Sequence, residues 1–131
     1  MKVLALDYGS ARTGVAVSDP TGTVARPLEV VENASEPAGL RRLVAVLERE
    51  QVERIVVGLP VTLRGAIGAQ AEETEAFVAA LRTVTEVPIE SFDERFTTKL
   101  AESRPTDAPS DAVAAAHLLT TYLEWKSALP R

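Results

Sequence analysis

The sequence predicts an α/β fold in which a mixed five-stranded sheet is flanked by helices. Three extended apolar segments come first, separated by turns short enough to pair them as an antiparallel meander. Two further extended segments follow, each after a stretch with helical spacing of apolar residues. Crossover helices of this kind require parallel pairing with the first unit. We therefore expect strands 1 to 3 to be antiparallel and strands 1, 4 and 5 to be parallel.

The N-terminal meander is defined by apolar runs and by the turn residues between them. Lys2–Tyr8 is apolar on both faces, which favours a central strand. Gly14–Ser18 and Thr23–Val31 are the next two strands, and the turn at 19–22 (Asp-Pro-Thr-Gly) separates them. Pro27 cannot donate to a strand ladder, so the third strand is predicted to lie at an edge.

The rest of the chain alternates between helical and extended patterns. Pro88 indicates that the last strand is also an edge strand. The expected elements are, in order, a helix at Glu36–Glu50, a strand at Arg54–Leu59, a helix within Ile67–Val84, a strand at Val87–Phe92, and closing helices at about Thr98–Ser103 and Asp111–Lys126.

Length and composition limit the class of protein. The 131 residues are expected to form one domain, 1–131, with a full core. The absence of cysteine excludes disulfides, thiolate catalysis and sulfur-ligated zinc. The sequence has no signal peptide and no run of about 18 apolar residues such as a membrane span needs. We therefore expect a soluble, cytoplasmic protein with no membrane partner.

The charge balance restricts how the protein could bind nucleic acid. The net charge is −5, with 19 acidic and 14 basic residues. Phosphate binding depends mainly on lysine and arginine, so this balance argues against a protein coated in nucleic acid. A nucleic-acid role therefore requires a local basic patch.

Carboxylates end or begin several of the predicted elements. Asp7 ends the first strand, Asp93 and Glu94 end the fifth, and Asp111 opens the last helix. In sheets of this kind, sites form beyond the carboxyl ends of the parallel strands. Carboxylates held within a few ångströms repel one another unless a hard cation binds between them. The set therefore predicts a site for Mg²⁺ or Mn²⁺, ions that often serve phosphoryl transfer.

The pattern leaves alternatives open for each acid. Side chains alternate along a strand, so Asp93 and Glu94 lie on opposite faces and only one can easily point at Asp7. Spacing does not decide between them. Each acid also has a structural interpretation: Asp7 as a turn cap, the pair as a solvated strand end beside Arg95, and Asp111 as a charge suited to the helix dipole.

Basic side chains occur in loops expected at the same edge. Arg12, in the turn after the first strand, could hold a phosphate or brace an acid. Further candidates for a basic patch are Arg64, Arg95, Lys99 and Arg104.

Three other residues of the last helix are interpreted as structural. His117 lies six positions after Asp111 and therefore points about 240° away from it. Tyr122 and Trp125 are expected to anchor the helix rather than to stack on bases.

Four sequence blocks carry a resemblance to a known family. They are LALDYGSARTGVAVSD at 4–19, VVGLPVTLRGAIGAQAEETEAF at 56–77, DERFTT at 93–98 and DAVAAAHLLTTYL at 111–123. With these blocks the chain resembles the YqgF-type family of Holliday-junction resolvase homologues, also described as pre-16S rRNA nucleases. The resemblance covers nearly the whole chain.

The resemblance implies a ribonuclease H-like fold and a metal-dependent nuclease. Two Mg²⁺ or Mn²⁺ ions would be held by Asp7, Asp111 and the acid within DER, assigned to Glu94 with Asp93 as the alternative. Arg12 and Arg95 match arginines of the family and would contact phosphate or orient the acids, and Arg64 is added as a substrate contact.

Two substrates fit this chemistry. The first is structured RNA, with cleavage in the processing of the 5′ end of precursor 16S rRNA. The alternative is branched DNA, as for a Holliday junction resolvase, a task that favours a two-fold dimer. Monomer and homodimer both remain open.

A third hypothesis is a module that binds without catalysis. The turn DYGSARTG at 7–14 resembles the phosphate-binding turn of the actin and sugar-kinase superfamily. A nucleotide- or nucleic-acid-binding module is therefore the alternative from another class, although 131 residues lack the second lobe that closes over ATP in that superfamily.

Overall fold

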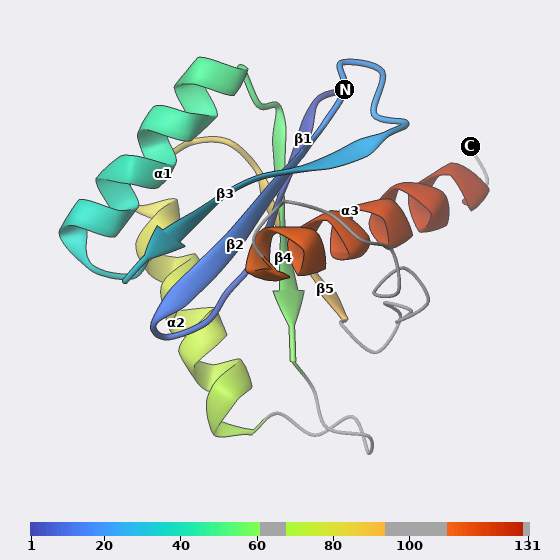
Figure 1. The fold of residues 1–131 in the computed structure, drawn as a ribbon. Helices are drawn as coiled ribbons and strands as arrows, with labels where there is room; N and C mark the ends of the chain where they lie inside the picture. Colours follow the sequence, from blue (N-terminus) through green and yellow to red (C-terminus); the bar gives the residue numbers. More distant parts are fainter. Residues whose placement is uncertain (61–67, 94–109, 130–131) are drawn as a thin grey trace.

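The five strands form one mixed sheet with helices on both faces (Figure 1). A computed structural model describes residues 1–60, 68–93 and 110–129. The predicted helix at Thr98–Ser103 lies outside these residues. The elements are β1 (Val3–Asp7), β2 (Arg12–Ser18), β3 (Ala25–Glu32), α1 (Pro37–Glu50), β4 (Arg54–Leu59), α2 (Ala69–Arg82), β5 (Ile89–Asp93) and α3 (Ser110–Ala128).

The predicted strand directions are confirmed. The strand order is β3-β2-β1-β4-β5. β1 pairs antiparallel with β2 and parallel with β4, and β5 pairs parallel with β4. β1 is therefore central, and β3 and β5 are the edge strands, as Pro27 and Pro88 predicted.

Several predicted boundaries were wrong by one or two residues. β2 begins at Arg12 rather than Gly14, because Arg12 continues the ladder opposite Glu32. β3 begins two residues later than predicted, since a turn holds the preceding residues. β5 is Ile89–Asp93 rather than Val87–Phe92, and α2 is confined to Ala69–Arg82.

The sheet is buried on both faces because successive side chains alternate between two cores. Leu4 and Leu6 of β1 belong to the core shared with α1 and α2. Val3 and Ala5 belong to the core under α3. This alternation decides which helix each residue at a strand end can meet.

Helix α3 lies close to the sheet because both surfaces carry small side chains. Ala112, Ala115 and Ala116 of α3 are buried, and Ala5 and Ala16 lie on the face of the sheet that α3 covers. Small residues let the helix and sheet backbones approach closely. The first turn of α3 is thereby held against β2.

The β2–β3 turn is organised by one carboxylate. Asp19 accepts hydrogen bonds from the backbone N–H groups of Thr23 (2.8 Å) and Val24 (2.9 Å) and from the hydroxyl of Thr21. These hydrogen bonds lower the pKa of Asp19 strongly. The bond from the Thr21 hydroxyl has the largest effect, and the two backbone N–H groups add to it. These bonds stabilise the ionised form and hold Thr23 and Val24 in the turn.

This turn gives the protein a pH-dependent contribution to stability. Because the pKa of Asp19 is lower in the folded state, its contribution is present at neutral pH and disappears as pH falls below the ordinary carboxyl value of about 4. Asp19→Asn is therefore expected to lower stability at pH 7, and the difference from wild type should shrink at more acidic pH. Urea unfolding at a series of pH values measures this. A difference that stays constant with pH would show that charge is not its cause.

No helix in the part of the chain that the structure describes is long and apolar enough to cross a membrane.

Candidate active site

Asp7 is the last residue of β1 and lies on the face of the sheet covered by α3. Side chains alternate along a strand, so Asp7 points to the same face as Val3 and Ala5, which pack under α3. The next residue, Tyr8, packs on the opposite face, where its ring stacks on Phe77 of α2 at 4.5 Å between centroids. This stacking fixes the chain just after Asp7, so the carboxylate is presented toward α3.

The turn after Asp7 requires a glycine at its tightest point. A Cβ atom on Gly9 would lie 2.5 Å from the carbonyl oxygen of Arg12. The Thr13 hydroxyl donates a long hydrogen bond of 3.5 Å to the carbonyl oxygen of Gly9. The turn therefore returns the chain directly into β2 and sets Arg12 beside the end of β1.

The first turn of α3 packs directly on Gly14. Gly14 is the register partner of Asp7 in the β1–β2 ladder. A Cβ atom on Gly14 would lie 1.8 Å from the carbonyl oxygen of Asp111 and 2.3 Å from its carbonyl carbon. Only a residue without a side chain allows this approach. The contact brings Asp111, from the C-terminal helix, next to the strand position that pairs with Asp7.

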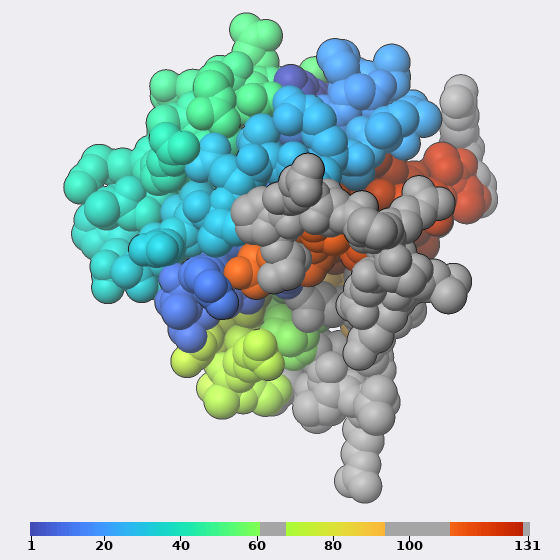
Figure 2. Space-filling model, viewed as in Figure 1, coloured from blue at the N-terminus to red at the C-terminus, as the bar shows by residue number. Residues whose placement is uncertain are grey.

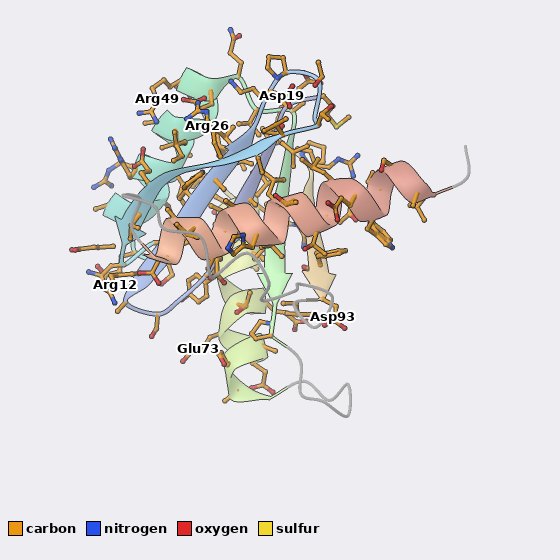
Figure 3. All side chains as sticks on the ribbon, turned by 45° about the vertical axis from the view of Figure 1, so that its right-hand side comes forward. Arg12, Asp19, Arg26, Arg49, Glu73 and Asp93 are labelled. Atoms are coloured by element: carbon orange, nitrogen blue, oxygen red, sulfur yellow. The ribbon has the colours of Figure 1, made fainter. Side chains whose placement is uncertain are left out.

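Arg12 bridges the start of β2 and the start of α3. Its Nε atom lies 3.4 Å from Oδ2 of Asp111, and Figure 3 shows Arg12 beside the first turn of α3. The side chains of Arg12 and Asp111 are 66% and 38% exposed. A pair this exposed contributes at most about 1 kcal/mol to stability. Both charged groups therefore remain accessible to a ligand.

Asp93 does not share the face of Asp7. It ends β5, two strands away from β1, so the two backbones are about 10 Å apart. Phe92 packs under α3, whereas Ile89, which has the same phase as Asp93, packs with the core of α1 and α2. Asp93 is labelled in Figure 3, at the end of β5 and far from Arg12.

Among the described residues, no three histidine or acidic side chains are grouped so that they could hold a metal ion. Asp93 therefore does not complete such a group with Asp7 and Asp111. The remaining predicted site residues lie outside the described residues; these are Glu94, Arg64, Arg95, Lys99 and Arg104.

Several other basic side chains lie on β3 and α1, away from Asp7 and Asp111. Glu29 binds Arg42 at 2.8 Å and Arg49 at 3.1 Å. Glu50 binds Lys2 at 3.2 Å and also contacts Arg26 and Arg49. Because these cations share two carboxylates, their charge is partly neutralised within the fold.

The structural interpretation of the end of α3 fits the contacts made there. Tyr122 is 1% exposed, and Phe92 and Trp125 pack against its ring. Its hydroxyl donates to Oε1 of Glu90 at 3.0 Å, and burial raises the pKa of Tyr122, with Glu90 adding to the effect. His117 lies in the same helix, and its buried Nε2 makes no hydrogen bond within the described residues.

Sequence reasoning missed the part played by Gly14. It was assigned only as the first residue of a strand, whereas it sets the position of α3. The available signal was a glycine inside an otherwise apolar strand, which often marks a close backbone approach. The ion pair between Arg54 and Glu90 (2.8 Å), which also receives the Tyr122 hydroxyl, was not predicted either.

Known proteins that this chain resembles match it over nearly its whole length. A protein of Rubrobacter xylanophilus named "Putative pre-16S rRNA nuclease" is 46% identical, over 94% of this chain and 92% of its own. A protein of the same name from Desulforudis audaxviator is 39% identical, over 94% of each chain.

Solved structures show the same fold at low sequence identity. RuvC of Thermus thermophilus in complex with a Holliday junction substrate has a TM-score of 0.68 and 19% identity, covering 100% of this chain and 98% of its own. A fowlpox virus resolvase, solved with Holliday junction DNA, has a TM-score of 0.57 and 10% identity, covering 96% of this chain and 99% of its own. The predicted ribonuclease H-like fold is confirmed by these neighbours.

The family is shown by a match over nearly the whole chain. Residues 1–125 match the RuvX family, which is described as Holliday junction resolvases. The match includes both Asp7 and the first turn of α3, and its relatives carry the name of a nuclease. The chain therefore belongs to the RuvX (YqgF-type) family of nucleases.

Proposed function

We propose that this protein is a divalent-metal-dependent nuclease that hydrolyses phosphodiester bonds in processing the 5′ end of precursor 16S rRNA. Asp7, Glu94 and Asp111 hold Mg²⁺ or Mn²⁺ in this proposal, with two ions in the complete site. Arg12, Arg64 and Arg95 contact the phosphate backbone. The names of the relatives, "Putative pre-16S rRNA nuclease", support this substrate.

One observation carries the proposal. The first turn of α3 lies against Gly14, the register partner of Asp7, so carboxylates from opposite ends of the chain lie at one edge of the sheet. Two carboxylates brought to the same end of the sheet repel each other, and the single positive charge of Arg12, paired with Asp111, offsets only part of their negative charge. A bound cation offsets that repulsion.

The donor chemistry of this edge fits hard divalent ions. Asp7 and Asp111 offer carboxylate oxygens, the ligands that Mg²⁺ and Mn²⁺ prefer. Both residues are partly exposed, which leaves room for water and for a phosphate. When bound, such ions lower the pKa of a water molecule and stabilise charge on the reacting phosphate.

The alternation along β5 supports Glu94 over Asp93 as the third acid. Phe92 packs under α3, whereas Asp93 lies on the opposite face of the sheet, which α1 and α2 cover. Asp93 is therefore turned away from the face of Asp7, and the proposal assigns the role to Glu94, its neighbour in the DER motif.

Arg12 has two roles in this proposal. Its ion pair with Asp111 orients that carboxylate, and its exposed guanidinium holds a phosphate oxygen of the substrate. An arginine suits both roles because its planar fork has five donors. A water molecule attacks phosphorus while the bond between phosphorus and the sugar oxygen breaks on the opposite side. The water gives its proton to a carboxylate at the end of β1, and the departing sugar oxygen takes up a proton from solvent.

Cleavage assays with matched substrates test the proposal. Purified protein is incubated with Mn²⁺ or Mg²⁺ and precursor 16S rRNA, a four-way DNA junction, or linear duplexes of each kind. We expect cleavage of the precursor near the 5′ end of the mature rRNA, and none in EDTA. Selective cleavage of the four-way junction would favour the resolvase, for which the family description and the resolvase-like fold argue.

The alternative of a non-catalytic module is tested in the same preparation. Absence of cleavage on all substrates, together with tight ATP binding by titration calorimetry, would favour a nucleotide-binding module over the nuclease.

A further inference from the structure

Helix α1 carries a surface groove that the proposed nuclease site does not use. The groove holds about 730 Å³ and its lining is mainly apolar. It runs along the exposed side of α1, with Val84 from the connection after α2 as its other wall. Val84 is 43% exposed, so its side chain adds apolar surface to the groove. The lining residues are Pro37, Leu40, Arg41, Val44, Ala45, Glu48 and Val84.

Two opposite charges stand at the two ends of this groove. Arg41 and Glu48 are seven residues apart on α1, so they lie on nearly the same line of the helix, about 10 Å apart. Within the described part of the chain, neither of them forms an ion pair. By contrast Arg42 and Arg49, on the side of α1 toward β3, are both paired with Glu29. The free charges of α1 are therefore confined to the groove.

The acidic end of the groove is reinforced by a second carboxylate. Glu48 also lines an adjoining hollow together with Glu86, which follows α2. Arg41 lines the other end of the groove. The groove thus has a basic end, an apolar middle around Val44 and Ala45, and an acidic end.

A surface with this order of charges is complementary to itself. If a second copy of α1 is laid antiparallel on the first, a two-fold axis passes between Val44 and Ala45. Arg41 then faces Glu48 of the second copy, and Glu48 faces Arg41 of the second copy. The apolar middle packs on its own equivalent. We propose that this α1 groove is an isologous dimer interface, whose partner is a second copy of this chain.

The proposed interface is small, which limits the affinity expected between the two copies. A standard protein interface buries about 800 Å² per partner, more than one helix face provides. The dimer is therefore expected to be weak and concentration-dependent, with charge pairing deciding its specificity.

The position of α1 fixes how the two copies would be oriented. Helices α1 and α3 cover opposite faces of the sheet, and Figure 2 shows α1 at the margin of the molecule away from α3. The two proposed nuclease sites, each containing Asp7 and Asp111, would therefore face outward on opposite sides of the dimer. The interface is independent of the proposed chemistry.

Charge reversal tests the proposal by sedimentation velocity over a range of protein concentrations. Arg41→Glu places two acids face to face at each end of the interface, and Glu48→Arg places two bases there. Each single variant is expected to weaken dimerisation about tenfold or more. The double variant restores opposite charges, and we expect it to dimerise like wild type.

A mixture of the two single variants gives the sharpest result. Each alone should be monomeric, but together they should form a heterodimer, because opposite charges then meet at both ends. Arg42→Glu is the matched control: it makes the same change of charge on the same helix, outside the groove, and should leave the dimer intact. Circular dichroism verifies folding. A wild type that stays monomeric at all concentrations, or single variants that dimerise as well as wild type, would overturn the proposal.

Discussion

Replacing Asp7 by asparagine is expected to reduce Mn²⁺-dependent cleavage by about 100-fold or more while the fold is retained. The change keeps the size and shape of the side chain and removes one negative charge at the end of β1. Asp7 is partly exposed, so the loss of charge costs little stability. Initial rates of cleavage, with thermal unfolding measured on the same samples, separate the two effects.

Two control variants make this result specific to the site. Glu73→Gln makes the same carboxylate-to-amide change on an exposed residue of α2 and should retain full activity. Asp93→Asn should cost much less than Glu94→Gln, because Asp93 lies on the other face of the sheet. Full activity of Asp7→Asn would rule out the proposed chemistry, and a larger loss in Asp93→Asn than in Glu94→Gln would reassign the third acid.

Among the glycines of the described residues, Gly14 is the one where replacement by alanine is expected to lower stability most. Its Cβ would lie 1.8 Å from the carbonyl oxygen of Asp111 and 3.0 Å from the backbone nitrogen of Ala112. Backbone atoms cannot move aside as a flexible side chain can, so the first turn of α3 must shift. We expect a loss of about 3 kcal/mol in the free energy of unfolding, together with a loss of cleavage as Asp111 moves.

Gly68→Ala is the matched control for this substitution. Gly68 precedes α2 with φ of −99°, and a Cβ there would meet no atom of the described residues within 4 Å. Its effect should stay below about 1 kcal/mol. Urea unfolding of both variants measures the comparison. A Gly14→Ala protein as stable and active as wild type would show that α3 does not need its close contact with β2.

The strand directions could be predicted because local patterns determine them. Short turns allow only antiparallel pairing among the first three strands, and crossover helices allow only parallel pairing afterwards. The edge strands followed from Pro27 and Pro88. Strand ends were less accurate, since side chains such as Asp19 hold residues in a turn that their own β propensity would place in a strand.

The candidate site was predictable only in part, for a physical reason. That Asp7 ends β1 and Asp111 lies in the first turn of α3 follows from periodicity. How close they come depends on Gly14, and thus on helix–sheet packing between residues almost a hundred positions apart. Alternation alone places Asp93 and Glu94 on opposite faces, and the observed packing of Phe92 and Ile89 puts Asp93 on the face of α1 and α2. Glu94 lies outside the described residues, and its role as the third acid stays a proposal.

In the proposed site, Asp7 and Asp111 share a divalent cation. Anomalous diffraction from a crystal soaked in Mn²⁺ tests it directly, because the signal locates the ion independently of the assigned ligands. We predict a manganese peak at the end of β1, within bonding distance of a carboxylate oxygen of each of these two residues. An ion bound elsewhere, or carboxylates that remain separate at saturating Mn²⁺, would contradict the account.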